Sequence, residues 1–222
     1  MIFPIGDDNI EGGHKPIISY SLIFINVIIF LVQLSIGEET MLQFASIPEE
    51  ITHGNRLFTL ITSMFLHGGA MHLIGNILFL WIFGDNIEAI IGSFMFLLFY
   101  LFGGFFAAGA HILTDPHSII PTIGASGAIS AVMGAYMVMF PKSRVKMIFI
   151  FFFKKFHIPA FLFLIFWFLQ QIFSGITTFS VVGSGGGVAW WAHIGGFVFG
   201  IAVGLILKEK FKGLYSYNIA KA

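Results

Sequence analysis

Ser126 is the residue whose surroundings in this sequence are best suited to chemistry. It follows Gly124-Ala125, precedes Gly127, and opens an apolar stretch that ends at Pro141. Glycine and alanine leave the backbone beside the serine bare, so a ligand can approach closely. The first turn of a helix also has N–H groups without internal partners, which can stabilise a developing negative oxygen. The pattern indicates a nucleophile, although small residues that pack membrane helices closely would look the same.

Two other stretches supply the groups that a serine nucleophile needs. His193 is the candidate general base that takes the hydroxyl proton. His72 and Asn76 are four residues apart on one helix face, and both can donate hydrogen bonds to an oxyanion beside the Ser126 N–H. No carboxylate is convincingly placed as a third member, so the sequence predicts a Ser–His dyad. One alternative is that His193 is a buried polar histidine in a glycine zipper. Others are that His72 and Asn76 only cap a helix or bond between helices, and that His67, His72 and His193 form a metal site.

The composition predicts a polytopic membrane protein. The chain has 222 residues, of which 57% are hydrophobic and 10% charged, whereas soluble domains are about 25% charged. The mean hydropathy is +0.93. A net charge of zero gives no sign of nucleic-acid binding, and the absence of cysteine excludes disulfides, a thiol nucleophile and thiolate metal sites. The expected fold class is all-α, a bundle of six transmembrane helices.

Six apolar stretches define the expected spans. They are residues 17–36, 72–83 with flanks, 94–113, 126–140, 158–175 and 189–207. We expect one membrane domain over 17–207, a polar N-terminal segment over 1–16 and a basic tail over 208–222. The motif Gly84-Asp85-Asn86 is expected to end the second span. A basic loop with an apolar patch over 142–157 is expected at the membrane interface.

The basic residues predict the orientation of the spans. Ten of the eleven Lys and Arg residues lie in the termini or in the loop between spans four and five, and Arg56 is the exception. Since Lys and Arg favour the cytoplasmic side, both termini are expected in the cytoplasm, in a bacterial inner membrane. Spans two, four and six then run inward, and each begins with candidate site residues.

Depth and packing both favour a meeting of Ser126 and His193. Each is the first of the last fifteen residues of its span, about 22 Å of helix, which places both about 8 Å inside a ~30 Å hydrocarbon layer. Small residues recur on one face of each span, which allows close packing. They are Gly127, Ala131 and Gly134 on span four, and Gly196, Gly200 and Gly204 on span six.

At these residues the chain resembles the rhomboid family of intramembrane serine proteases. The motifs are GASG at 124–127, HxxxN at 72–76 and AHIGGFVFG at 192–200, and the resemblance covers essentially all six spans. It implies Ser126 as nucleophile, His193 as general base, and His72, Asn76 and the Ser126 N–H as the oxyanion hole. Structural support is expected from six residues: Arg56, Glu88, Gly124, Gly127, Gly196 and Gly200.

Two positions depart from the family pattern. Family members often carry an aromatic residue four positions after the serine, packed on the catalytic histidine, and that position is Ser130 here. Another group must therefore hold His193. The Trp–Arg-like pair of the first loop is Asn55-Arg56. The resemblance also implies that span five and the Gly-rich loop 177–188 form a gate and a lid.

The sequence thus predicts an intramembrane serine endopeptidase that cleaves transmembrane or membrane-border segments of membrane proteins. Segments with Gly, Ala, Ser or Pro near the outer face should be preferred. The expected partners are these substrates and the lipid bilayer, with no nucleic acid, metal or organic cofactor. The alternatives are a catalytically inactive rhomboid-like protein that binds transmembrane helices, and a small transporter or channel.

Overall fold

The computed structural model describes residues 2–8, 13–180 and 188–211. The long helices are α1 (Ile17–Ile36), α5 (Ala70–Ile91), α6 (Ser93–Thr114), α7 (Ser126–Met139), α8 (Ala160–Ser180) and α9 (Trp190–Lys210). Short helices α2 (Glu38–Leu42), α3 (Pro48–Thr52), α4 (Thr59–Thr62) and η1 (Ser63–Phe65) form the connection after α1. Most of the predicted tail, and residues 181–187 of the predicted lid, lie outside the described residues.

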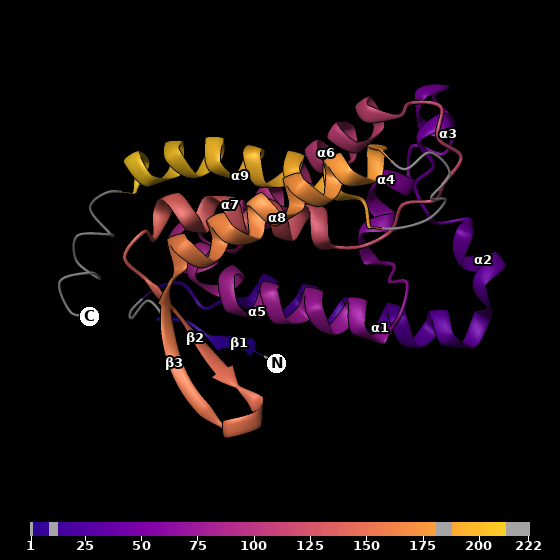
Figure 1. Cartoon of the computed structure of the whole chain (residues 1–222). Helices are drawn as coiled ribbons and strands as arrows, with labels where there is room; N and C mark the ends of the chain where they lie inside the picture. The colour runs from indigo at the N-terminus through magenta and orange to yellow at the C-terminus, as the bar shows by residue number, and fades with distance from the viewer. Residues whose placement is uncertain (1, 9–12, 181–187, 212–222) are drawn as a thin grey trace.

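The prediction of a helical membrane bundle is confirmed. Within the described ranges, five helices are long and apolar enough to cross a membrane, namely α1, α5, α6, α8 and α9, and α7 is a shorter apolar helix. Helix α7 lies inside the bundle between α9 and α5, with α8 across one side (Figure 1). Its 14 residues extend only about 21 Å. Because the hydrocarbon layer is ~30 Å thick, at least one end of α7 must lie within the membrane.

Helices α7 and α9 pack backbone against backbone. A Cβ added at Gly196 would lie 2.1 Å from the carbonyl oxygen of Gly127, and one added at Gly200 would lie 2.0 Å from that of Ala131. A Cβ at Gly134 would similarly lie 2.1 Å from the carbonyl oxygen of Phe197. The close approach of two small-residue faces is therefore present, and it requires glycine at these positions.

The prediction that the second span ends at Gly84 is wrong, because α5 continues to Ile91. The missing side chain of Gly84 makes room for α1, since an added Cβ would lie 3.1 Å from Ser19 Oγ. One turn later Glu88 accepts hydrogen bonds from the backbone N–H groups of Ile18 (2.8 Å) and Ser19 (2.7 Å) at the start of α1. The Ser19 hydroxyl also donates to it at 2.7 Å. These tertiary contacts outweigh the local tendency of the Gly-Asp-Asn sequence to end a helix.

A small antiparallel sheet was missed by the sequence reading, which treated residues 142–157 as an interfacial loop and 1–16 as a polar segment. The strands are β1 (Ile2–Gly6), β2 (Arg144–Phe149) and β3 (Lys154–Pro159), in the order β1-β2-β3. The single turn η2 (Ile150–Phe152) joins β2 to β3. Val145 and Met147 alternate with more exposed neighbours and are buried against the bundle. The fold is thus a helical bundle with a sheet at one end.

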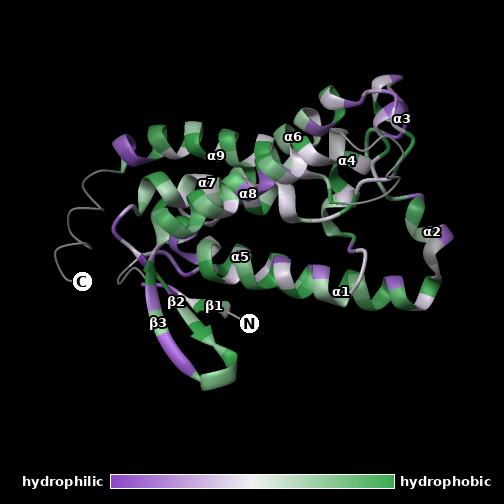
Figure 2. Cartoon of the chain, in the orientation of Figure 1, coloured by the Kyte–Doolittle hydropathy of each residue, from purple (hydrophilic) through white to green (hydrophobic). Residues whose placement is uncertain are grey.

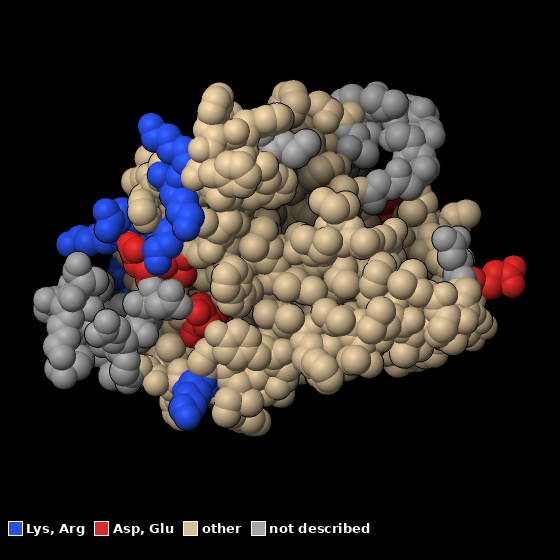
Figure 3. All heavy atoms as spheres, turned by 90° about the horizontal axis from the view of Figure 1, so that it is seen from below, with Lys and Arg blue, Asp and Glu red and all other residues tan. Residues whose placement is uncertain are grey.

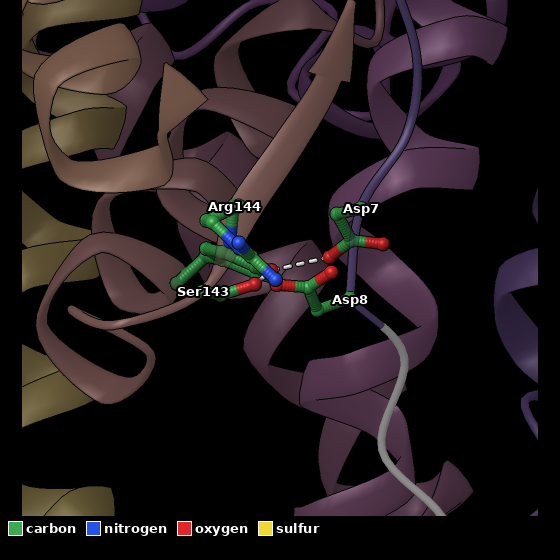
Figure 4. Close-up of polar contacts among 5 residues, drawn as sticks. Asp7, Asp8, Ser143 and Arg144 are labelled. Atoms are coloured by element: carbon green, nitrogen blue, oxygen red, sulfur yellow. Dashed lines mark hydrogen bonds and ion pairs between the residues drawn. The ribbon is translucent and has the colours of Figure 1, made fainter. Parts of the chain in front are cut away.

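Two aspartates fasten the N-terminal strand to the bundle. Asp7 is buried and accepts hydrogen bonds from Asn86 Nδ2 (2.7 Å) and the Tyr136 hydroxyl. Asp8 forms an ion pair with Arg144 at 3.4 Å, and Figure 4 shows both aspartates facing the start of β2. Burial raises the pKa of Asp7 to about 6. The first strand is therefore tied to α5, α7 and β2 together.

Charge separates the two ends of the bundle. We call the end where α5, α7 and α9 begin the site end, and the end that carries the sheet the basic end. The described Lys and Arg residues gather largely at the basic end, while the long faces are apolar (Figures 2 and 3). The charge-poor belt between the ends is typical of a surface that contacts lipid. The cytoplasmic placement of the basic end remains a prediction.

Candidate active site

The structure brings Ser126 and His193 together at the site end. Ser126 is the first residue of α7, and His193 lies in the first turn of α9. Their side chains form a hydrogen bond of 2.7 Å between Ser126 Oγ and His193 Nε2. His193 is buried, whereas Ser126 is half-buried. The tight α7–α9 crossing sets this distance, because both side chains project from the two helices that it joins.

Gln171 of α8 is a site residue that the sequence reading missed. Its Oε1 lies 2.8 Å from His193 Nδ1, and both side chains are buried. The Gln171 Nε2 group donates to the carbonyl oxygen of Trp167 (3.3 Å) and to Gln170 Oε1 (3.0 Å), which fixes the oxygen of the amide toward His193. An amide oxygen can only accept, so Nδ1 carries the proton and Nε2 is left to accept the Ser126 hydroxyl. A polar side chain inside a Phe-rich span was the available signal.

Aromatic contacts to His193 also come from a different helix than the family pattern implies. The ring centroids of Trp167 and Trp190 lie 5.9 Å and 6.1 Å from that of His193. Ser130, at the position usually aromatic, instead donates a 2.6 Å hydrogen bond to the Ser126 carbonyl oxygen. Gly196 of α9 lies close to this position, since a Cβ added at Gly196 would lie 3.3 Å from the Ser130 Cβ. His193 is therefore held by α8 and by its own helix.

His72 lies on the other side of the serine. The Gly68 N–H donates to His72 Nδ1 at 3.3 Å, so the ring proton of neutral His72 is on Nε2. A Cβ built on Gly124 would lie 2.9 Å from this Nε2 and 3.4 Å from Ser126 Oγ. Gly124 also has a φ of +128°, a conformation that favours glycine. The His72 N–H donor therefore lies beside Gly124, at the serine.

Two more donors at this level have no acceptor in the described part of the chain. Asn76 is buried one turn after His72, and its Nδ2 has no hydrogen-bond partner among the described residues. The Ser126 N–H is at the start of α7, where no intrahelical acceptor exists. Since unsatisfied buried donors are costly, donors of this kind suit a site that receives a negatively charged oxygen.

A cavity of about 40 Å³ adjoins Ser126, enough for about three water molecules. Small side chains and hydroxyls contribute much of its lining, and one imidazole is present. The lining includes Ser46, Ser63, Gly104, Ala107, His111 and Thr122. This space is large enough for a small side chain but not for an aromatic one.

The remaining predicted residues lie in supporting positions. Arg56 Nη2 donates to the carbonyl oxygens of Leu42 (3.0 Å) and Gln43 in the first loop. Glu88 anchors α1 and is 16 residues from His72 on α5, about 24 Å along the helix. Both His193 ring nitrogens are engaged, and within the described ranges no group of three or more possible metal ligands occurs.

Fold and site together define a polytopic membrane protein with a Ser–His pair held among its helices. A family model for the Rhomboid domain matches residues 54–210. The chain therefore belongs to the rhomboid family.

The relatives include bacterial and mitochondrial proteins. Rhomboid protease GluP of Bacillus subtilis is 33% identical over 127 residues, which cover 55% of this chain and 24% of GluP. The human presenilin-associated rhomboid-like protein, mitochondrial, is 28% identical over 206 residues, 87% of this chain and 48% of that protein. Rhomboid protein 1, mitochondrial, of Saccharomyces cerevisiae is 28% identical over 137 residues, 60% of this chain and 39% of the yeast protein. The chain thus spans less than half the length of each of these relatives.

Proposed function

We propose that this protein is an intramembrane serine endopeptidase that hydrolyses a peptide bond in a transmembrane or membrane-border segment of another protein. The observation that carries the proposal is the 2.7 Å hydrogen bond from Ser126 Oγ to the Nε2 of a histidine whose other nitrogen already has an acceptor. A nucleophile paired with an oriented base is the arrangement that acyl transfer requires.

The residues have distinct roles in the proposed reaction. His193 Nε2 takes the hydroxyl proton while Ser126 Oγ attacks the peptide carbonyl carbon. The Ser126 N–H, His72 Nε2–H and Asn76 Nδ2 donate to the oxyanion that forms. His193 then gives its proton to the leaving amine, which leaves an acyl group on Ser126. Water, deprotonated by His193, hydrolyses this ester and restores the serine.

The proposed substrate is a membrane-protein segment with small residues at the cleaved bond. The cavity beside Ser126 is only about 40 Å³, so Gly, Ala or Ser fits next to the scissile carbonyl better than Leu or Phe. Such residues also weaken a substrate helix locally, which exposes the carbonyl. The proposed setting is a bacterial inner membrane with the basic end in the cytoplasm, as the positive-inside rule favours.

The test compares purified wild type with Ser126→Ala and His193→Ala on a model transmembrane substrate in detergent. Wild type should cleave and should react with a fluorophosphonate serine probe, and both activities should fall at least about 10³-fold in each variant. Circular dichroism confirms that the variants stay folded. If wild type neither cleaves several substrates nor reacts with the probe, the protein instead fits an inactive rhomboid-like binder of transmembrane helices.

A further inference from the structure

Helix α8 packs one side on the bundle, where Phe168 stacks on Phe197 of α9, and leaves its other side open. Its lipid-facing side is strongly exposed, with Phe166, Leu169 and Phe173 each more than half exposed. Leu164 and Gln171 are its fully enclosed side chains near the middle of the helix, and they lie two turns apart on one stripe. Gln171 thus places a polar group on the narrow side of α8 that meets α9.

We propose that Gln171 is the positioning residue for His193, so that the dyad is competent only while α8 is docked. The inference rests on the proposed function. The 2.8 Å contact to Nδ1 selects the tautomer that leaves Nε2 as the base. Because Gln171 donates to Trp167 on its own helix, the acceptor cannot follow His193 if α8 moves away. Displacement of α8 therefore removes the hydrogen bond and the Trp167 ring contact together.

Within the part of the chain that the structure describes, no acid interacts with His193 that could replace Gln171. The described titratable groups that interact with His193 are His72 of α5 and His111 of α6, and neither is an acid. The site thus uses a neutral acceptor where a serine triad has a carboxylate. A neutral amide orients the ring but stabilises the imidazolium less than a carboxylate does.

The test uses Gln171→Leu, Gln171→Glu and the control Phe173→Leu, which changes an exposed residue of the same helix. We expect Gln171→Leu to lower kcat about 10- to 100-fold with little change in KM, because only the orientation of the base is lost. Gln171→Glu should retain activity, and the acid limb of its pH–rate profile should move to higher pH, since the carboxylate favours the imidazolium. Phe173→Leu should match wild type.

Two results would overturn this role. One is a Gln171→Leu variant with wild-type kcat and wild-type fluorophosphonate labelling rate. The other, which applies even if that variant misfolds, is a folded Gln171→Glu enzyme with an unshifted pH profile. Both differ from failure of the proposed function, in which wild type itself neither cleaves nor reacts with the probe.

A separate observation concerns the tip of the β2–β3 hairpin. Residues Ile150–Phe153 are all exposed, and Phe151, Phe152 and Phe153 are 74%, 74% and 80% exposed. Lys154 and Lys155 follow at once and are exposed as well. The hairpin projects sideways from the basic end, across the direction of the helices (Figure 1). Its second strand runs directly into the membrane helix α8 at Ala160, so its base lies at the membrane boundary.

From this placement we infer that the tip inserts into the lipid leaflet at the basic end, with the two lysines on anionic headgroups. A run of exposed aromatic residues flanked by lysines is the pattern of an interfacial anchor, and the positive charge complements anionic lipid. No cysteine is present in the chain, so a spin label on Phe152→Cys reports the tip alone. His157→Cys, on the exposed face of β3, is the control.

In vesicles containing anionic phosphatidylglycerol, the spin label at 152 should be more accessible to oxygen than to a water-soluble nickel reagent. The control label should show the opposite preference. Adding Lys154→Glu and Lys155→Glu should raise the nickel accessibility at 152. Nickel-accessible label at 152 in all vesicles would overturn the inference, as would burial that depends on protein concentration, which would point to a second copy of the chain.

Discussion

Gly200→Ala tests whether the α7–α9 crossing sets the catalytic distance. The new Cβ would lie 2.0 Å from the Ala131 carbonyl oxygen, and such contacts essentially never fall below 3.0 Å. The obstacle is backbone, so the helices must separate by at least about 1 Å. Carried to the site, that shift lengthens the 2.7 Å Ser126–His193 hydrogen bond beyond hydrogen-bond range. A misplacement of 1 Å costs about 10²-fold in rate, so kcat should fall by about that factor.

The assay is cleavage of a model transmembrane substrate in proteoliposomes, with circular dichroism and gel filtration as checks of folding. Gly204→Ala should lower kcat less than Gly200→Ala does, because the added Cβ would lie 2.7 Å from Ala135 Cα. Gly109→Ala is the matched control, since nothing lies within 4 Å of an added Cβ there. The reasoning fails if Gly200→Ala keeps activity within about threefold of wild type, or if Gly109→Ala loses as much.

Two further predictions concern stability. Glu88→Gln should lower the free energy of unfolding by about 1–3 kcal/mol, because the charged acceptor of the α1 N–H groups is lost. Thermal unfolding in detergent measures this loss. An equal loss in Glu39→Gln, at an exposed site, would contradict the prediction. Burial, and next the charge of His72, lower the pKa of His67 to about 4 from 6.5. As the pH falls, His67 therefore takes up a proton in the unfolded chain before it does so in the folded protein. The free energy of unfolding should decline by up to about 3 kcal/mol between pH 6.5 and pH 4. His67→Gln should flatten this decline, and an unchanged pH dependence in that variant would refute it.

Much of the site could be predicted from sequence because its signals are local or periodic. Span lengths follow from runs of apolar residues, and the small faces of α7 and α9 follow from glycine and alanine at helical spacing. Ser126 and His193 lie near the starts of two such spans, and each is the same number of residues from the end of its span. The sequence therefore predicted the same depth in the membrane for both residues. Composition alone was enough to identify a membrane bundle.

Tertiary structure decided the features that depend on contacts between distant segments. The sequence offered Gln171 as one of two adjacent glutamines in an apolar span, and only the docking of α8 on α9 places its oxygen on His193. The strand at Ile2–Gly6 exists because it pairs with residues 140 or more positions later. Helix α5 continues through Gly84 because Glu88 binds the start of α1. Hydrogen bonds of this kind depend on positions in space, and periodicity along the chain contains no information about them.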